Sequence, residues 1–223
     1  MTIDLTATTD WTTLGPVMEL VNTPFMVHMT SDDARRLLID AARRADAMGV
    51  MGFDDVTALD AKAADRLLAR ARDAGVAAVP KHAWSDVTPP SEADVAALLR
   101  LVIAALEGSP VPKTEWPSLS RIFDSEQLGR LVGISLSSLR RYQSGDRDTP
   151  DAVAERLHCL ALIVADLAGS YNDIGIRRWF ERPRAALGGK APAAFLKGEW
   201  DPESAGTQKV RALARSLVAS SAT

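Results

Sequence analysis

Residues 125–145, SEQLGRLVGISLSSLRRYQSG, constrain the fold more than any other part of the chain. Leu128 and Val132 lie four residues apart and therefore face the same side of a helix. Gly133 then falls where a tight turn needs a positive φ, and Ser135 is placed to cap a second helix. Gly129 is a small residue where the two helices would approach each other closely, and Leu139 and Tyr142 are placed to pack the second helix onto the first. The pattern predicts a helix-turn-helix.

The rest of the chain also shows helical periodicity, with hardly any alternation of β-branched residues. Ser31 and Ser91 are candidate N-caps of two helices in the first half, and another helix is expected over about 59–74. Only the proline-rich stretch 76–90 allows a short strand. Further helical patterns lie at about 118–123, 150–168, 172–180, 191–197 and 203–219.

Three prolines, Pro110, Pro112 and Pro117, predict a break in helical structure and a domain boundary near 108–118. We therefore expect a mainly α protein in three parts. A mostly helical N-terminal domain of unknown role would cover residues 1–110. An all-α helix-turn-helix over 113–148 and a helical, toxin-binding-like bundle over 149–223 would follow.

Composition and charge indicate an ordinary globular protein with unequal halves. Hydrophobic residues make up 47% of the chain and charged residues 25%. Residues 1–112 carry 10 basic and 16 acidic residues, a net charge of −6, whereas 113–223 carry 16 and 13, a net of +3. A mildly basic second half is compatible with weak attraction to nucleic acid. The single cysteine, the lack of a signal-peptide pattern and the lack of an apolar run of ~18 residues predict a cytoplasmic protein outside the membrane.

The start of the second helix of the helix-turn-helix is the candidate DNA-binding surface. In DNA-binding proteins of this kind, these residues face base edges in the major groove. Serine and arginine can bond to bases or phosphates, and a leucine can contact a thymine methyl group. The alternative is that the two helices only pack and their arginines are solvated, or that the leucine meets a protein partner. The candidate DNA-binding residues are Ser135, Leu136, Ser137, Ser138, Arg140 and Arg141.

Residues 176–196, IRRWFERPRAALGGKAPAAFL, carry a more specific series. A tryptophan precedes a proline, and Leu-Gly-Gly, a basic residue, a small residue and a second proline follow. Together with the helix-turn-helix upstream, this series resembles the Xre/MbcA/ParS antitoxins over about residues 115–218. The matching positions are Trp179, Pro183, Leu187, Gly188, Gly189, Lys190, Pro192 and Leu196.

The resemblance implies an antitoxin of a type II toxin-antitoxin system, whose partner is a RES-domain toxin that consumes NAD. In that family the C-terminal part of the antitoxin occludes the NAD cleft of the toxin, and the helix-turn-helix can repress the antitoxin's own promoter. A homodimer is expected, because operator DNA tends to be palindromic. This chain differs from the family in its N-terminal extension of about 110 residues and its longer tail. The toxin-binding residues that the resemblance implies are Trp179, Arg182, Arg184, Lys190, Lys197 and Trp200.

Other interpretations of the same residues stay open. Trp179 and Phe180 also fit a hydrophobic core, since large aromatic side chains dominate core burial. The chain could be a stand-alone transcriptional regulator whose first 110 residues sense a ligand or mediate dimerisation. An enzyme hidden in the first half is the third hypothesis, but no catalytic set is motivated, and Cys159 fits a small buried hydrophobe. His28, His82 and His158 lack metal-ligand spacing, so we predict no enzyme, no metal and no cofactor.

Overall fold

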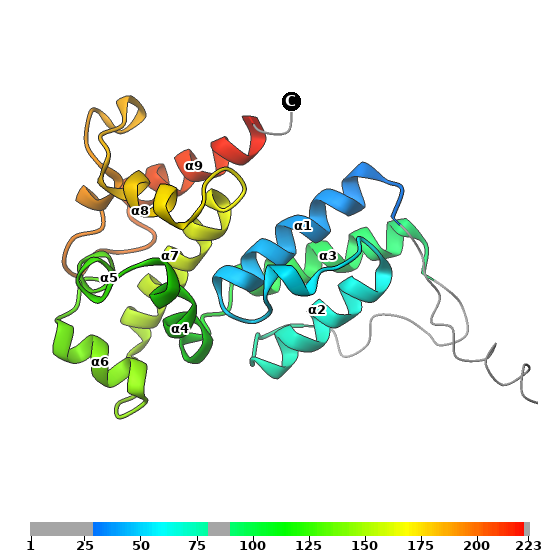
Figure 1. The fold of residues 1–223 in the computed structure, drawn as a ribbon, viewed down its shortest axis with the longest axis horizontal. Helices are drawn as coiled ribbons and strands as arrows, with labels where there is room; N and C mark the ends of the chain where they lie inside the picture. The colour runs from blue at the N-terminus through cyan, green and yellow to red at the C-terminus, as the bar shows by residue number, and fades with distance from the viewer. Residues whose placement is uncertain (1–28, 80–89, 221–223) are drawn as a thin grey trace, which may run out of the picture.

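The computed structural model describes residues 29–79 and 90–220 as a mainly helical protein, which confirms the predicted fold class (Figure 1). Within these residues the chain forms no strand, and an isolated antiparallel bridge joins Arg184 to Lys190. Residues 76–79, the described start of the stretch that allowed a strand, are not extended in a sheet. The rest of that stretch, up to residue 89, lies outside the described residues.

The first group of helices comprises α1 (Asp32–Ala47), α2 (Ala61–Asp73) and α3 (Glu92–Glu107), with the 3₁₀ turn η2 (Phe53–Asp55). Ser91 caps α3 as predicted, because its side chain accepts the Asp94 N–H while the Asp94 carboxylate accepts the Ser91 N–H. Ser31 lies at the N-cap of α1 but makes no capping bond with its side chain. Its N–H instead donates to Glu92 at 2.7 Å, which ties the start of α1 to the start of α3.

The second group follows after the short connection 108–111. It comprises α4 (Pro112–Ile122), α5 (Ser125–Val132), α6 (Leu136–Ser144), α7 (Asp151–Leu167), α8 (Asp173–Glu181) and α9 (Ala205–Ser220), with the 3₁₀ turns η3 (Ala185–Leu187) and η4 (Pro192–Ala194). Across residues 29–79 and 90–220, no single helix is both long enough and apolar enough to cross a membrane. Helices α3 and α4 meet both criteria only when taken together, and the pair is bent by 85°.

One sequence prediction about helix positions is confirmed only in part, and another is wrong. The break after α3 is confirmed at residues 108–111, but it does not extend to 118, because α4 begins at Pro112 and contains Pro117. A proline at the first helical position loses nothing, since that N–H has no acceptor within the helix in any case. The helix expected over 191–197 is reduced to the turn Pro192–Ala194, and Gly198 follows with a φ of +62°.

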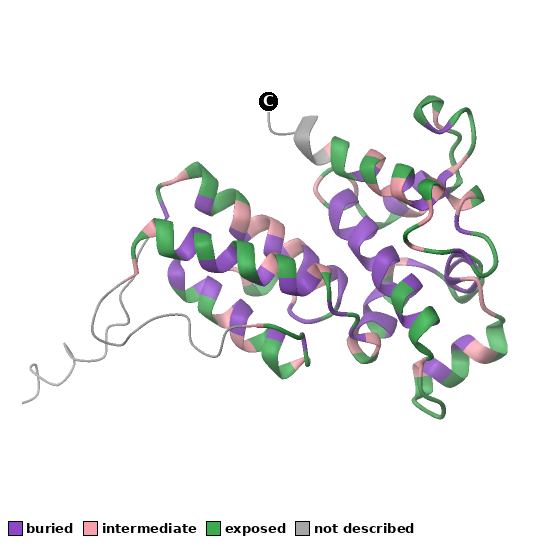
Figure 2. Ribbon diagram, turned by 180° about the vertical axis from the view of Figure 1, so that it is seen from behind, coloured by how far each residue is buried: buried purple, intermediate pink, exposed green. Residues whose placement is uncertain are grey.

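Helix α7 runs through the centre of the described structure and is buried along most of its length (Figure 2). Helix α1 packs against α3 on one side and α7 on the other, while α4 and α9 also contact α7. One cluster of buried hydrophobic residues therefore extends through both groups of helices. The predicted N-terminal domain and the helices after it share this core.

Candidate nucleic-acid and partner interface

Helices α5 and α6 form the predicted helix-turn-helix geometry around Gly133. This glycine has a φ of +76°, in the left-handed region that other residues avoid, and it ends α5. Ser135 caps α6 by accepting the Ser138 N–H at 3.2 Å. The predicted packing positions of both helices are buried, namely Leu128, Val132, Leu139 and Tyr142. These local predictions are confirmed.

The C-terminal end of α5 is held by residues from far along the chain. The Trp200 indole N–H donates to the Leu131 carbonyl at 2.8 Å, and the Arg156 Nε donates to the Val132 carbonyl at 2.9 Å. These donors satisfy carbonyls that a helix end otherwise leaves without partners. Gly198 lies directly against the turn, since a Cβ on Gly133 would fall 1.7 Å from the Gly198 carbonyl oxygen. The helix-turn-helix and the loop after η4 are therefore built as one unit.

The outer face of α6 carries most of the predicted DNA-binding residues. Leu136 is 39% exposed, and Ser137, Arg140 and Arg141 are exposed as well. Among the residues that the structure describes, neither arginine forms an ion pair with a carboxylate. Ser135 is exposed but capped onto its own helix, and Ser138 is half-buried beside it. The face thus offers two free guanidinium groups and one apolar side chain to a partner.

Two of the residues expected to contact the toxin, Trp179 and Trp200, lie inside the fold, which corrects that part of the expectation. Trp179 is 1% exposed and meets the Phe180 ring edge-on, with ring centroids 5.2 Å apart. Trp200 is 7% exposed and bonds to the end of α5. A buried ring has no face left for a partner, because core neighbours already cover it. The core interpretation of Trp179 and Phe180 is confirmed.

The basic residues of the same region surround a tight loop. The Arg184 N–H donates to the Lys190 carbonyl at 3.1 Å and closes the loop, while Gly188 and Gly189 turn the chain with φ values of +64° and +77°. The Arg184 guanidinium lies 5.5 Å from the centre of the Trp179 ring and is half-buried. The remaining predicted basic residues are exposed: Arg182, Lys190 and Lys197. We call residues 182–190 the basic loop.

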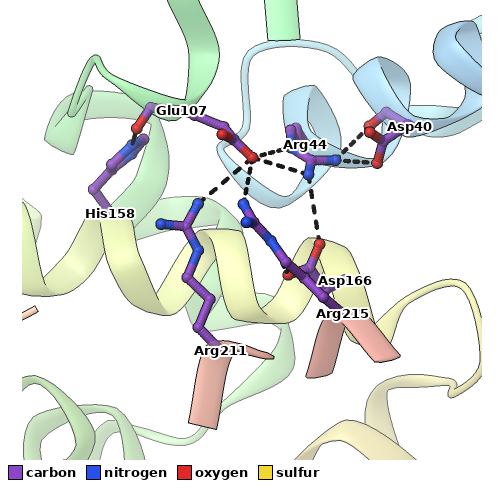
Figure 3. A network of polar contacts seen from close by, with 7 residues as sticks. All are labelled: Asp40, Arg44, Glu107, His158, Asp166, Arg211 and Arg215. Atoms are coloured by element: carbon purple, nitrogen blue, oxygen red, sulfur yellow. Dashed lines mark hydrogen bonds and ion pairs between the residues drawn. The ribbon is translucent and has the colours of Figure 1, made fainter. Parts of the chain in front are cut away.

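A charged cluster that sequence reasoning missed joins the N-terminal helices to α7 and α9 (Figure 3). The Glu107 carboxylate lies at its centre, 3.0 Å from Arg44 and 2.6 Å from Arg215. Arg44 also pairs with Asp40 one turn earlier on α1. Glu107 and Arg215 are 108 residues apart, so only the fold brings them together. The members of the charged cluster are Asp40, Arg44, Glu107, Asp166, Arg211 and Arg215.

The two buried acids of this region have unusual electrostatics. Burial raises the pKa of Asp166 from 3.8 to about 6, although Arg44 at 3.6 Å and Arg215 at 3.5 Å favour its charged form. Burial also raises the pKa of Glu115, a fully buried residue of α4. His158 lies 2.7 Å from Glu115 and 3.0 Å from the Glu107 carbonyl oxygen. Since side-chain exposures are only 7% and 0%, this His–Glu pair is a core contact between α4 and α7.

Asp166→Asn is expected to stabilise the protein near pH 7.5. The raised pKa means that the folded state binds more protons than the unfolded state between about pH 4 and pH 6. The contribution of Asp166 is therefore favourable at low pH and is lost as the pH rises through about 6. Urea denaturation should show a gain of about 2 kcal/mol for the variant at pH 7.5 that shrinks toward pH 4.5. Asp148→Asn, at an exposed position, is the control, and a variant destabilised at every pH would contradict the assignment.

Comparisons of the chain with protein-family models, with curated proteins and with solved structures return no match.

Proposed function

We propose that this chain is an antitoxin that binds a RES-domain toxin and prevents that enzyme from reaching NAD. The observation that carries the proposal is the basic loop. The residues that resemble the antitoxin series build a compact support in which Trp179, Leu187 and Leu196 are buried. The same series leaves Arg182 and Lys190 exposed. A closed, supported loop loses little conformational entropy when a partner docks on it.

Occlusion requires no chemistry from the antitoxin. A partner seated on the basic loop would have its cleft covered by protein atoms, and NAD would lose access to it. Co-purification of the chain with the product of an adjoining RES-domain reading frame tests this proposal. We expect a complex that survives gel filtration, and separate elution of two folded proteins would argue against it.

The exposed face of α6 supports a second activity, binding of operator DNA. Arg140 and Arg141 project from the helix that enters the major groove in proteins of this geometry. We propose that the chain represses its own promoter in this way, as a homodimer on a palindromic site. The alternative function, a stand-alone transcriptional regulator, rests on the same face but needs no toxin.

The double variant Arg140→Ala/Arg141→Ala is expected to weaken binding to the promoter duplex at least tenfold. Each arginine can supply a base or phosphate contact, and one good bidentate base contact contributes about 1–3 kcal/mol. A gel shift at fixed salt measures the effect, with Lys209→Ala on the exposed side of α9 as the control. An unchanged shift would discard DNA contact by α6.

A further inference from the structure

An open pocket of about 580 Å³ lies beside the turn of the helix-turn-helix. Its walls come from segments that are distant in sequence, and the end of α8 contributes Glu181. Arg130, Gly133 and Ile134 belong to the helix-turn-helix, whereas Lys197 and Gly198 belong to the loop after η4. Figure 1 shows the chain after α8 passing close to α5. The contact of Gly198 with Gly133 fixes the position of the neighbouring Lys197.

The pocket has an excess of positive charge. Arg130 is highly exposed, and its Nη2 lies 3.5 Å from the Glu181 carboxylate. Glu181 also accepts a hydrogen bond from the Gln127 side chain at 3.3 Å, so Arg130 does not hold this carboxylate alone. Lys197 is exposed, and no ion pair involves it within the described part of the chain. Two cations and one carboxylate therefore line the pocket, and this net charge of +1 suits a singly charged anion.

The pocket also has a defined position relative to DNA. Helix α6 begins at Leu136, directly after the turn that lines the pocket. In a bound helix-turn-helix the second helix enters the major groove while the first crosses the phosphate backbone. Arg130 lies on the exposed side of that first helix, α5. The backbone that borders the groove would consequently pass the mouth of the pocket.

We propose that Arg130 and Lys197 together bind one phosphodiester of the DNA backbone beside α6. This inference rests on the DNA-binding half of the proposed function and extends the DNA-binding surface beyond α6. It also moves Lys197 from the toxin-binding set to the DNA-binding set. A phosphate contact of this kind positions the protein on DNA without reading sequence.

The test is fluorescence anisotropy of the full chain with its promoter duplex and a scrambled duplex over a range of salt concentrations. Lys197→Ala and Arg130→Ala should each weaken binding to both duplexes about five- to tenfold at 0.1 M salt. The plot of log K against log salt has a negative slope, and the magnitude of this slope should decrease by about 0.9, the value for one lost phosphate contact. Lys197→Arg should retain the slope, and Glu181→Gln should tighten binding because it removes the competing carboxylate. Lys209→Ala is the matched control for loss of a lysine charge.

Three outcomes would contradict the phosphate site. If the wild-type chain binds DNA and both alanine variants keep its dependence of log K on log salt, the phosphate site is overturned. The proposed role of α6 would not be affected by that result. Weaker binding to the promoter alone would mean base contact and would also overturn it. A wild-type chain that binds neither duplex would overturn this inference together with the DNA-binding half of the proposed function.

A phosphate group could also come from a soluble nucleotide, and a competition arm separates the two sources. ADP added at constant ionic strength is expected to leave the duplex bound. Displacement of the duplex by ADP from the wild type, but not from Lys197→Ala, would show that the pocket binds nucleotides instead of DNA.

Discussion

Gly133→Val is expected to lower the free energy of unfolding by more than about 3 kcal/mol. A β-branched residue at a φ of +76° is strained by about 1–3 kcal/mol in any surroundings. Here the new Cβ would also fall 1.7 Å from the Gly198 carbonyl oxygen, so the backbone of one segment must move away. That movement would strain the Trp200 bond to the end of α5 as well. Urea denaturation followed by circular dichroism measures the loss.

Gly145→Val is the matched control for this prediction. Gly145 ends α6 with a φ of +77°, but nothing lies within 4 Å of the position of an added Cβ. We expect a loss of about 1–3 kcal/mol, from backbone strain alone. Equal losses at the two glycines would mean that the contact between Gly133 and Gly198 contributes nothing to stability.

Trp179→Ala is expected to cost about 3–5 kcal/mol and to lower Tm by about 10 °C. The ring is 1% exposed, meets Phe180 edge-on and lies under the Arg184 guanidinium. Its removal leaves a cavity that a packed interior fills only in part. The support of the basic loop would loosen at the same time, so binding of the toxin should weaken with stability.

The control for Trp179→Ala is Ile174→Ala on the same helix. Ile174 is 51% exposed and should change stability by no more than about 0.5 kcal/mol. A Trp179→Ala variant that keeps the wild-type melting temperature but loses its partner would contradict the burial of this ring. It would restore the interpretation of Trp179 as an exposed anchor.

Local features of the fold were predictable because their signals lie within a few residues of each other. The turn at Gly133, the cap at Ser135 and the capping box at Ser91 depend on neighbours three or four positions away. Periodicity likewise predicted α1, α2, α7 and α9. Pro112 misled the prediction, because a proline at the first helical position starts a helix instead of breaking it.

The features that depend on tertiary contacts were not predictable. Nothing in the sequence near Glu107 indicates its pairing with Arg44 and Arg215, since the partners come from other helices. The contact of Gly198 with Gly133 could not be predicted either, because a single glycine after a lysine occurs in many kinds of turn and does not indicate its tertiary neighbour. The burial of Trp179 was also not settled by the sequence. Its place in a recognisable series suggested a contact with a partner, whereas its burial makes it part of the support.

The most direct test of the proposed function is consumption of NAD by a RES-domain toxin, measured while purified chain is titrated in. We predict that consumption stops when about one equivalent of chain is present, because under the proposed function each docked chain covers one cleft. NAD consumption that continues at the full rate in the presence of excess folded chain would contradict the proposed function.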